Sequence, residues 1–197
     1  MALSFPKTLK QLTILLLTMG MYGCNESREL KTITVAEFSS FVEATNYVTD
    51  AEKYGWSIVQ KTVYEYELVE GATWRLPDGK EASKANDPVT QVSYQDALAY
   101  CQWASVRLPS YEEYWEAVKN DSRSIVMNNT QILEVAAVNV VGNTWDITTT
   151  ENRRGEIRLA GGSYLCAPST CNGTNPDRTL FVSPDTGNTH ISFSVFR

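Results

Sequence analysis

A four-residue pattern that marks the start of a helix is followed by apolar residues at helical spacing at three places, and this limits how the chain can fold. In this pattern Ser or Thr caps the first free amide groups, and an acidic residue three positions later reaches back to the cap. The pattern occurs at Thr34–Glu37, at Ser93–Asp96 and at Ser110–Glu113. Apolar residues at spacings of three and four follow, which predicts helices that each bury one face.

The rest of the chain predicts short strands and irregular segments. Residues 56–76 alternate weakly between apolar and polar and are predicted to form one or two strands. Pro77–Lys80 is predicted to be a turn, and residues 132–141 are apolar but do not distinguish a strand from buried coil. Glycines divide the last third into short pieces. The fold class is therefore α+β, with two or three helices packed against small sheets.

The N-terminus has the pattern of an export signal. Lys7 and Lys10 precede the apolar stretch Leu12–Met19, which ends shortly before Gly23-Cys24. This arrangement resembles the bacterial lipobox, in which the cysteine is lipidated, so Cys24 is the predicted lipidation site. An ordinary secretory signal and an uncleaved anchor remain alternatives. Each of these readings places the domain outside the cytoplasm, in the bacterial cell envelope.

The predicted domain boundaries follow from this signal. Residues 1–23 form a lipoprotein-type signal peptide, residues 24–33 a polar tether, and residues 34–197 one domain. The charge balance of 17 basic against 23 acidic residues, without a basic cluster, argues against a nucleic-acid partner.

The cysteines do not form a disulfide framework. Cys24 belongs to the signal, and Cys101 lies in an apolar helical run and is predicted to be a buried thiol. Cys166 and Cys171 form a close pair. In an exported protein such a pair is commonly a local disulfide, and the sequence leaves open whether these two residues are thiols or a disulfide.

Five segments, in order, resemble the formylglycine-generating enzyme (sulfatase-modifying factor) family. The resemblance implies the C-type-lectin-like sulfatase-modifying factor fold, with little regular secondary structure. It marks the chain as a truncated, divergent member. The segments contain Phe41–Ser57, Gly71–Gly79, Pro88–Glu113, Gly142–Asp146 and Gly161–Thr186.

The family oxidises a cysteine of a sulfatase to Cα-formylglycine, using copper and molecular oxygen. The resemblance implies that Cys166 and Cys171 are the catalytic cysteines and hold Cu(I). Soft thiolates select Cu(I), and two sulfur ligands leave a position for a substrate thiol. The implied substrate is an exported sulfatase-like protein with a Cys-x-Pro-x-Arg segment.

The resemblance also assigns neighbouring residues. Ser163, Trp145 and His190 are placed in the substrate-binding site. A calcium site with oxygen ligands is implied at four further positions. Its residues are Asn139, Gly142, Thr144 and Asp146.

Several features depart from the family. An Asp stands at position 146 where the family has the longer Glu, and the family's Gly-Phe-Arg reads Ser192-Phe193-Ser194. The N-terminal strand of the family is expected to be missing. The aromatic and arginine-rich run after the second cysteine is also replaced.

These departures keep a second hypothesis open, a non-catalytic envelope lipoprotein that acts as a binding or assembly module. In that case the partners are envelope proteins, and the membrane is reached through the lipid anchor. The related iron-dependent sulfoxide synthases are excluded because they require a histidine cluster and His190 is the only histidine.

Overall fold

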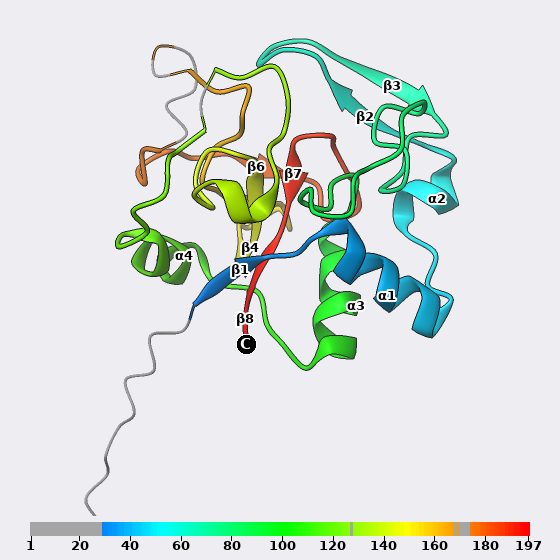
Figure 1. The fold of residues 1–197 in the computed structure, drawn as a ribbon, viewed down its shortest axis with the longest axis horizontal. Coiled ribbons are helices and arrows are strands. Elements are labelled where there is room, and N and C mark those ends of the chain that lie inside the picture. Colours follow the sequence, from blue (N-terminus) through cyan, green and yellow to red (C-terminus); the bar gives the residue numbers. More distant parts are fainter. Residues whose placement is uncertain (1–28, 127, 168, 170–173) are drawn as a thin grey trace, which may run out of the picture.

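The computed structural model describes residues 29–126, 128–167, 169 and 174–197. Helices and short strands alternate along this part of the chain, and α1 and α3 lie side by side (Figure 1). The elements are β1 (Leu30–Thr32), α1 (Val35–Thr45), α2 (Asp50–Tyr54), β2 (Trp56–Gln60), β3 (Tyr66–Glu70), α3 (Tyr94–Ala104), α4 (Tyr111–Val118), the 3-10 turn η1 (Val135–Ala137), β4 (Trp145–Glu151), β5 (Ile157–Ala160), β6 (Phe181–Val182), β7 (Ile191–Ser192) and β8 (Ser194–Phe196).

The three predicted helix starts are confirmed. Thr34, Ser93 and Ser110 cap α1, α3 and α4, and in each case both halves of the capping box are formed. The structure adds α2, which the sequence analysis did not predict. Its cap, Thr49 with Glu52, forms the same box, so the pattern was present but followed by a helix too short to show periodicity.

In the described part of the chain, three small sheets complete the fold, as expected for α+β. β1 pairs with β8, β2 pairs with β3, and the third sheet has the order β6-β5-β4-β7. β4 and β5 are antiparallel, whereas β4 and β7 are parallel. Residues 132–141, which the sequence left undecided, contain only η1.

The predicted end of the tether is wrong. Leu30–Thr32 pairs with Ser194–Phe196 in β8, and Ile33 is fully buried. The domain therefore includes residues that were assigned to the tether, and a three-residue strand, β1, precedes α1. The pairing partner lies at the opposite end of the chain, so local sequence gave no sign of it. The signal peptide and Cys24 lie outside the described residues.

An aromatic core joins the helices to the C-terminal strands. The ring of Phe38 lies 5.3 Å from those of Phe41 and Trp74, and Tyr100 lies 5.4 Å from Phe193. Such pairs add to the free energy gained by burying large apolar rings. Cys101 packs against this core as a free thiol, as predicted, and burial raises its pKa to about 12.

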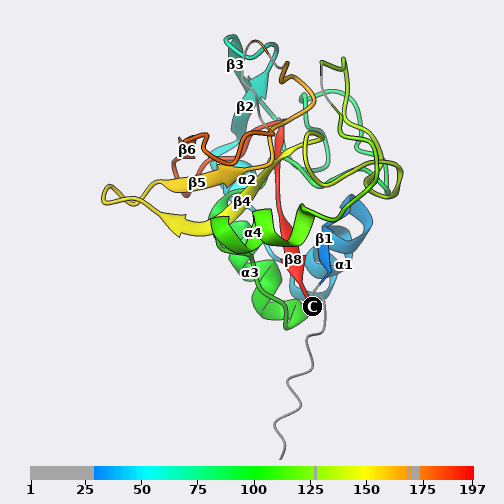
Figure 2. The same ribbon diagram turned by 90° about the vertical axis from the view of Figure 1, so that its left-hand side faces the viewer.

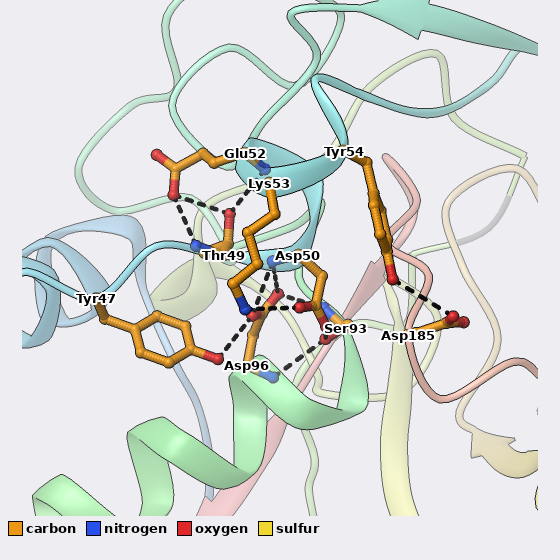
Figure 3. Close-up of polar contacts among 9 residues, drawn as sticks. All are labelled: Tyr47, Thr49, Asp50, Glu52, Lys53, Tyr54, Ser93, Asp96 and Asp185. Atoms are coloured by element: carbon orange, nitrogen blue, oxygen red, sulfur yellow. Dashed lines mark hydrogen bonds and ion pairs between the residues drawn. The ribbon is translucent and has the colours of Figure 1, made fainter.

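A buried polar cluster fixes α2 against the start of α3 (Figure 3). The carboxylate of Asp96 accepts hydrogen bonds from the Tyr47 hydroxyl at 3.0 Å and from the backbone N–H groups of Asp50 at 3.1 Å and Ser93 at 2.9 Å. The Ser93 hydroxyl donates to Asp50 at 2.6 Å. Asp96 is therefore a structural connector, because donors from the segment at Tyr47–Asp50 and from Ser93 depend on one side chain.

The turn after β5 depends on two consecutive glycines with positive φ, Gly161 at 85° and Gly162 at 72°. L side chains rarely adopt this conformation. At Gly161 an added methyl group would also overlap the fully buried Tyr114 hydroxyl. This turn leads directly to Ser163 and Cys166.

We expect Gly161→Ala to lower the free energy of unfolding by about 2–4 kcal/mol, through backbone strain and overpacking together. Gly155→Ala is the matched control, because Gly155 has a similar φ of 79° and only an ordinary contact at 3.5 Å. It should cost about 1 kcal/mol, from strain alone. Urea unfolding measures both. Equal losses for the two variants would contradict the predicted overlap with Tyr114.

Candidate functional site

Four of the predicted site residues line one cavity of about 250 Å³. Trp145 comes from the start of β4, Ser163 and Cys166 from the turn after β5, and His190 from the residue before β7. The remaining lining comes from the β2–β3 hairpin and from the segments leading to β6 and β7. Those lining residues are Gln60, Val63, Tyr64, Leu159, Arg178, Leu180, Val182, Asn188 and Ile191.

Backbone pairing explains how these residues meet. The Trp145 N–H donates to the carbonyl of His190 at 2.9 Å, in the parallel pair of β4 and β7. The Cys166 N–H donates to the carbonyl of Ser163 at 2.8 Å, which closes a tight turn. Trp145 and His190 lie 45 positions apart in the sequence, and this pairing brings their side chains to the same cavity.

The Cys166 sulfur has a polar surrounding although it is almost fully buried. The Ser163 N–H donates to Sγ at 3.5 Å, and the Ser163 hydroxyl lies 4.0 Å from Sγ. The same hydroxyl lies 3.3 Å from Nδ1 of His190. Burial lowers the pKa of His190 to about 4, so the imidazole is neutral near pH 7 and can accept or donate a hydrogen bond.

Cys166 is disulfide-bonded in the structure. Cys171, the other half of the predicted pair, lies outside the described residues. A thiolate pair for copper requires reduction of this disulfide by two electrons. Cys166 otherwise fits a soft-metal ligand, because its sulfur faces a cavity that also holds a neutral imidazole. Among the described residues, the cavity included, no group of three or more His, Cys, Asp or Glu is arranged for a metal ion.

Two of the four predicted calcium ligands, Asn139 and Asp146, make hydrogen bonds within the protein. The amide of Asn139 accepts from the Val141 N–H at 2.8 Å and donates to the carbonyl of Asp121 at 3.0 Å. Asp146 is fully buried and accepts from the Ser194 hydroxyl at 2.5 Å. Burial raises the pKa of Asp146 to about 7, which does not favour a charged calcium ligand. The calcium site therefore stays a prediction that these contacts do not favour.

Arg178 is a cavity residue that the sequence analysis missed. Of the described residues that line the cavity it is the only charged one, and its guanidinium lies 5.8 Å from the centroid of the Trp145 ring. A guanidinium over an indole is a favourable cation–π arrangement. The sequence gave one sign of it, a single arginine in the segment that replaces the family's arginine-rich run.

The fold has helices around small, irregular sheets, and the cavity lined by Cys166 lies between the third sheet and the β2–β3 hairpin. These features define a sulfatase-modifying-factor-like domain. The family described as "Sulfatase-modifying factor enzyme 1-like domain" matches residues 29–131, more than half of the chain. The chain belongs to this family. The matched range ends before the segment that contains Cys166.

Named relatives agree with this assignment. The chain is 43% identical over 98 residues to the formylglycine-generating enzyme of Thermomonospora curvata, in an alignment that covers 41% of this chain and 32% of that protein. It is 28% identical over 249 residues to the formylglycine-generating enzyme of Mycobacterium tuberculosis, covering 82% of this chain and 83% of that protein. It is also 38% identical over 103 residues to the inactive Cα-formylglycine-generating enzyme 2 of Bos taurus, covering 43% of this chain and 34% of that protein.

A solved structure supports the fold. The structure of PvdO from Pseudomonas aeruginosa superposes with a TM-score of 0.61 at 12% identity, covering 83% of this chain and 77% of that one. At this identity the likeness concerns the fold alone. The expected α+β sulfatase-modifying factor fold is thus confirmed.

None of the helices in the described part of the chain is long and apolar enough to cross a membrane. The lipid anchor at Cys24 and the location in the cell envelope stay predictions.

Proposed function

We propose that this protein oxidises a cysteine side chain of an exported, sulfatase-like protein to Cα-formylglycine at the cavity lined by Cys166. The observation that carries the proposal is the convergence of Cys166, Ser163, Trp145 and His190 on one cavity. The names of the relatives support the same chemistry.

In this proposal Cys166 and Cys171, once reduced, would hold Cu(I). The copper ion would bind the substrate thiol and molecular oxygen. Ser163 holds the Cys166 sulfur through its N–H and places its hydroxyl between that sulfur and His190. Trp145 and the apolar lining exclude water from the thiol. Conversion of CH₂–SH and O₂ to an aldehyde, H₂S and water balances with two further electrons and two protons, which a thiol reductant provides.

We propose the cell envelope as the location, with Cys24 as the lipid anchor. The motivating observation is the basic and apolar N-terminal stretch that ends in Gly23-Cys24. Metabolic labelling with a fatty-acid analogue should mark the wild-type protein and leave Cys24→Ser unlabelled. Equal labelling of the two proteins would reject the anchor.

We expect Cys166→Ser to reduce aldehyde formation at least 100-fold, because it removes a ligand sulfur. The assay incubates a Cys-x-Pro-x-Arg peptide with the protein, copper, oxygen and a thiol reductant, and detects the aldehyde by hydrazide trapping and mass spectrometry. Cys101→Ser is the matched control. It also removes a buried cysteine, but this residue lies in α3 and does not line the cavity.

Copper binding gives a second readout that does not need turnover. After reduction, wild type and Cys101→Ser should compete with a Cu(I) chelator, and Cys166→Ser should lose at least tenfold in affinity. If Cys166→Ser keeps full activity or full copper affinity, the oxidase proposal is wrong.

A non-catalytic binding module is the second candidate. Two observations favour it: one relative is described as an inactive Cα-formylglycine-generating enzyme, and Cys166 is held in a disulfide. A wild-type protein that forms no aldehyde, and that binds no copper after reduction, would establish this candidate in place of the oxidase.

A further inference from the structure

The β2–β3 hairpin exposes an apolar face that the cavity does not account for. Tyr66 and Leu68 in β3 are 63% and 62% exposed. The pairing register places them on the same face as Ile58 and Trp56. The Tyr54 ring stacks on Trp56 with centroids 6.0 Å apart, which extends the face. Contiguous exposed apolar side chains of this kind mark interaction surfaces.

The hairpin lies at the periphery of the fold in both ribbon views (Figures 1 and 2). Its sheet has two strands within the described residues. The edge of β2 that faces away from β3 is occupied, because the Thr189 N–H donates to the Ile58 carbonyl at 3.2 Å. The outer edge of β3 faces no other described strand.

The backbone groups on this edge can be assigned from the hydrogen-bond alternation of antiparallel pairs. The Lys61 N–H donates to the Glu65 carbonyl at 2.8 Å, so Lys61 and Glu65 form a hydrogen-bonded pair. Alternation along the register then directs the N–H and C=O groups of Tyr66, Leu68 and Glu70 away from β2. The groups of Tyr66 and Leu68 form a template for one more strand, whereas the Glu70 carbonyl lies against the loop at Gly79.

The charge of the hairpin indicates which polypeptide would dock. Three exposed acids, Glu65, Glu67 and Glu70, lie on or beside β3. Lys61, the only base in residues 56–70, lies 3.4 Å from Glu67. Asp185 adds a further carboxylate and accepts from the Tyr54 hydroxyl at 3.5 Å (Figure 3). This surface attracts basic side chains and repels an anionic membrane.

The hairpin also leads to the cavity. Its turn end contributes Gln60, Val63 and Tyr64 to the cavity lining, and Tyr64 is 77% exposed at the rim. A strand that runs along β3 from Glu70 toward Tyr66 therefore arrives at the opening beside Cys166.

We infer that the outer edge of β3 binds an extended polypeptide with alternating apolar and basic side chains, by strand addition. Its apolar side chains cover Tyr66 and Leu68, and its basic side chains face the glutamates. The inference rests on the proposed function in one respect, that the docked polypeptide is the one whose cysteine enters the cavity. Docking itself requires no chemistry at Cys166.

Binding is tested with the full chain carrying Cys166→Ser and a fluorescein-labelled peptide of alternating Val and Lys without cysteine. Fluorescence anisotropy should show binding that weakens at least tenfold when Glu replaces Lys in the peptide. Tyr66→Ser with Leu68→Ser should weaken it at least tenfold as well. Leu98→Ser is the matched control, because it removes an exposed apolar side chain from α3, away from the hairpin.

Hydrogen exchange identifies strand addition. On peptide binding, the amides of Tyr66, Leu68 and Glu70 should exchange at least tenfold more slowly, while those of Glu67 and Val69, which already face β2, should not change. Leu68→Pro removes an edge donor without removing a β2–β3 hydrogen bond, and should weaken binding at least tenfold.

Three outcomes would each overturn the inference. The Lys and Glu peptides bind equally, the amides of Tyr66, Leu68 and Glu70 exchange at an unchanged rate, or the protein binds anionic phosphatidylserine vesicles in place of the peptide. Failure of the oxidase proposal appears separately, as absence of aldehyde with peptide docking intact. Failure of the docking inference appears as binding of the Val and Lys peptide that Tyr66→Ser with Leu68→Ser leaves unchanged, while aldehyde still forms from a short cysteine peptide.

Discussion

Replacing Asp146 with Asn is expected to stabilise the protein by up to about 4 kcal/mol at pH 8 and to change little at pH 3.5. Asp146 is fully buried, and the Ser194 hydroxyl donates to its Oδ1 at 2.5 Å. Its other oxygen, Oδ2, makes no well-formed hydrogen bond, although the Tyr114 hydroxyl lies close to it. Within the described part of the chain, no basic side chain contributes to the pKa of this carboxyl group.

The sign follows from the pKa values. Burial raises the pKa of Asp146 from 3.8 to about 7 in the folded state. Below pH 3.8 the group is protonated in both states and costs nothing. As pH rises from about 4 to 7, the unfolded state releases the proton and the folded state keeps it, so stability falls by about 1.4 kcal/mol per pH unit. Above pH 7 the loss is complete. Asn has nearly the same shape and no proton to lose.

Urea unfolding of wild type and Asp146→Asn from pH 3.5 to 8, in a calcium chelator, measures the difference. The two proteins should differ increasingly up to pH 7 and by a constant amount above it. A parallel series with calcium tests the calcium site predicted from the sequence. If calcium stabilises wild type and not Asp146→Asn, the carboxyl group is a charged ligand and the neutral-acid interpretation is wrong.

Asp96→Ala is expected to have the opposite sign and to destabilise the protein by about 3–5 kcal/mol. The substitution leaves the Tyr47 hydroxyl and the N–H groups of Asp50 and Ser93 without their acceptor in a buried site. Each unsatisfied buried donor costs about 1–3 kcal/mol. The pKa of Asp96 is raised by burial and by the charge of Asp50. The buried charge therefore costs the wild type some stability, and Asp96→Ala removes that cost, which offsets part of the loss.

Asp96→Asn separates the acceptor from the charge. The amide keeps Oδ1 for Tyr47 and Asp50, but its NH₂ group opposes the Ser93 N–H, so about half of the loss is expected. Thermal and urea unfolding at pH 7 compare the three proteins. A loss for Asp96→Ala below about 1 kcal/mol would show that water replaces the carboxylate and that this cluster does not hold α2 against α3.

The two aspartates show why burial alone does not give the role of an acidic residue. Both are fully buried, but three donors from two segments surround Asp96, whereas Asp146 has one well-formed hydrogen bond. This difference arises from contacts between residues that are distant in the sequence, such as Tyr47 with Asp96 and Ser194 with Asp146. Sequence patterns do not contain that information.

The candidate site was likewise only partly predictable from the sequence. The turn around Ser163 and Cys166 follows from nearby glycines, and the resemblance identified its residues. The contribution of Arg178, Gln60 and Tyr64 to the cavity could not be predicted, because these side chains come from a loop and a hairpin that meet the turn only in the folded chain.

By itself, the sequence determined the starts of α1, α3 and α4, the buried thiol of Cys101, the α+β class and the family, because caps, helical periodicity and motifs are local. Only the tertiary structure decided that Leu30–Thr32 belongs to the domain, that burial raises the pKa of Asp146, and that β3 keeps a free edge at Tyr66 and Leu68. These properties depend on strand partners and on desolvation by residues far along the chain. They exist only once the chain has folded.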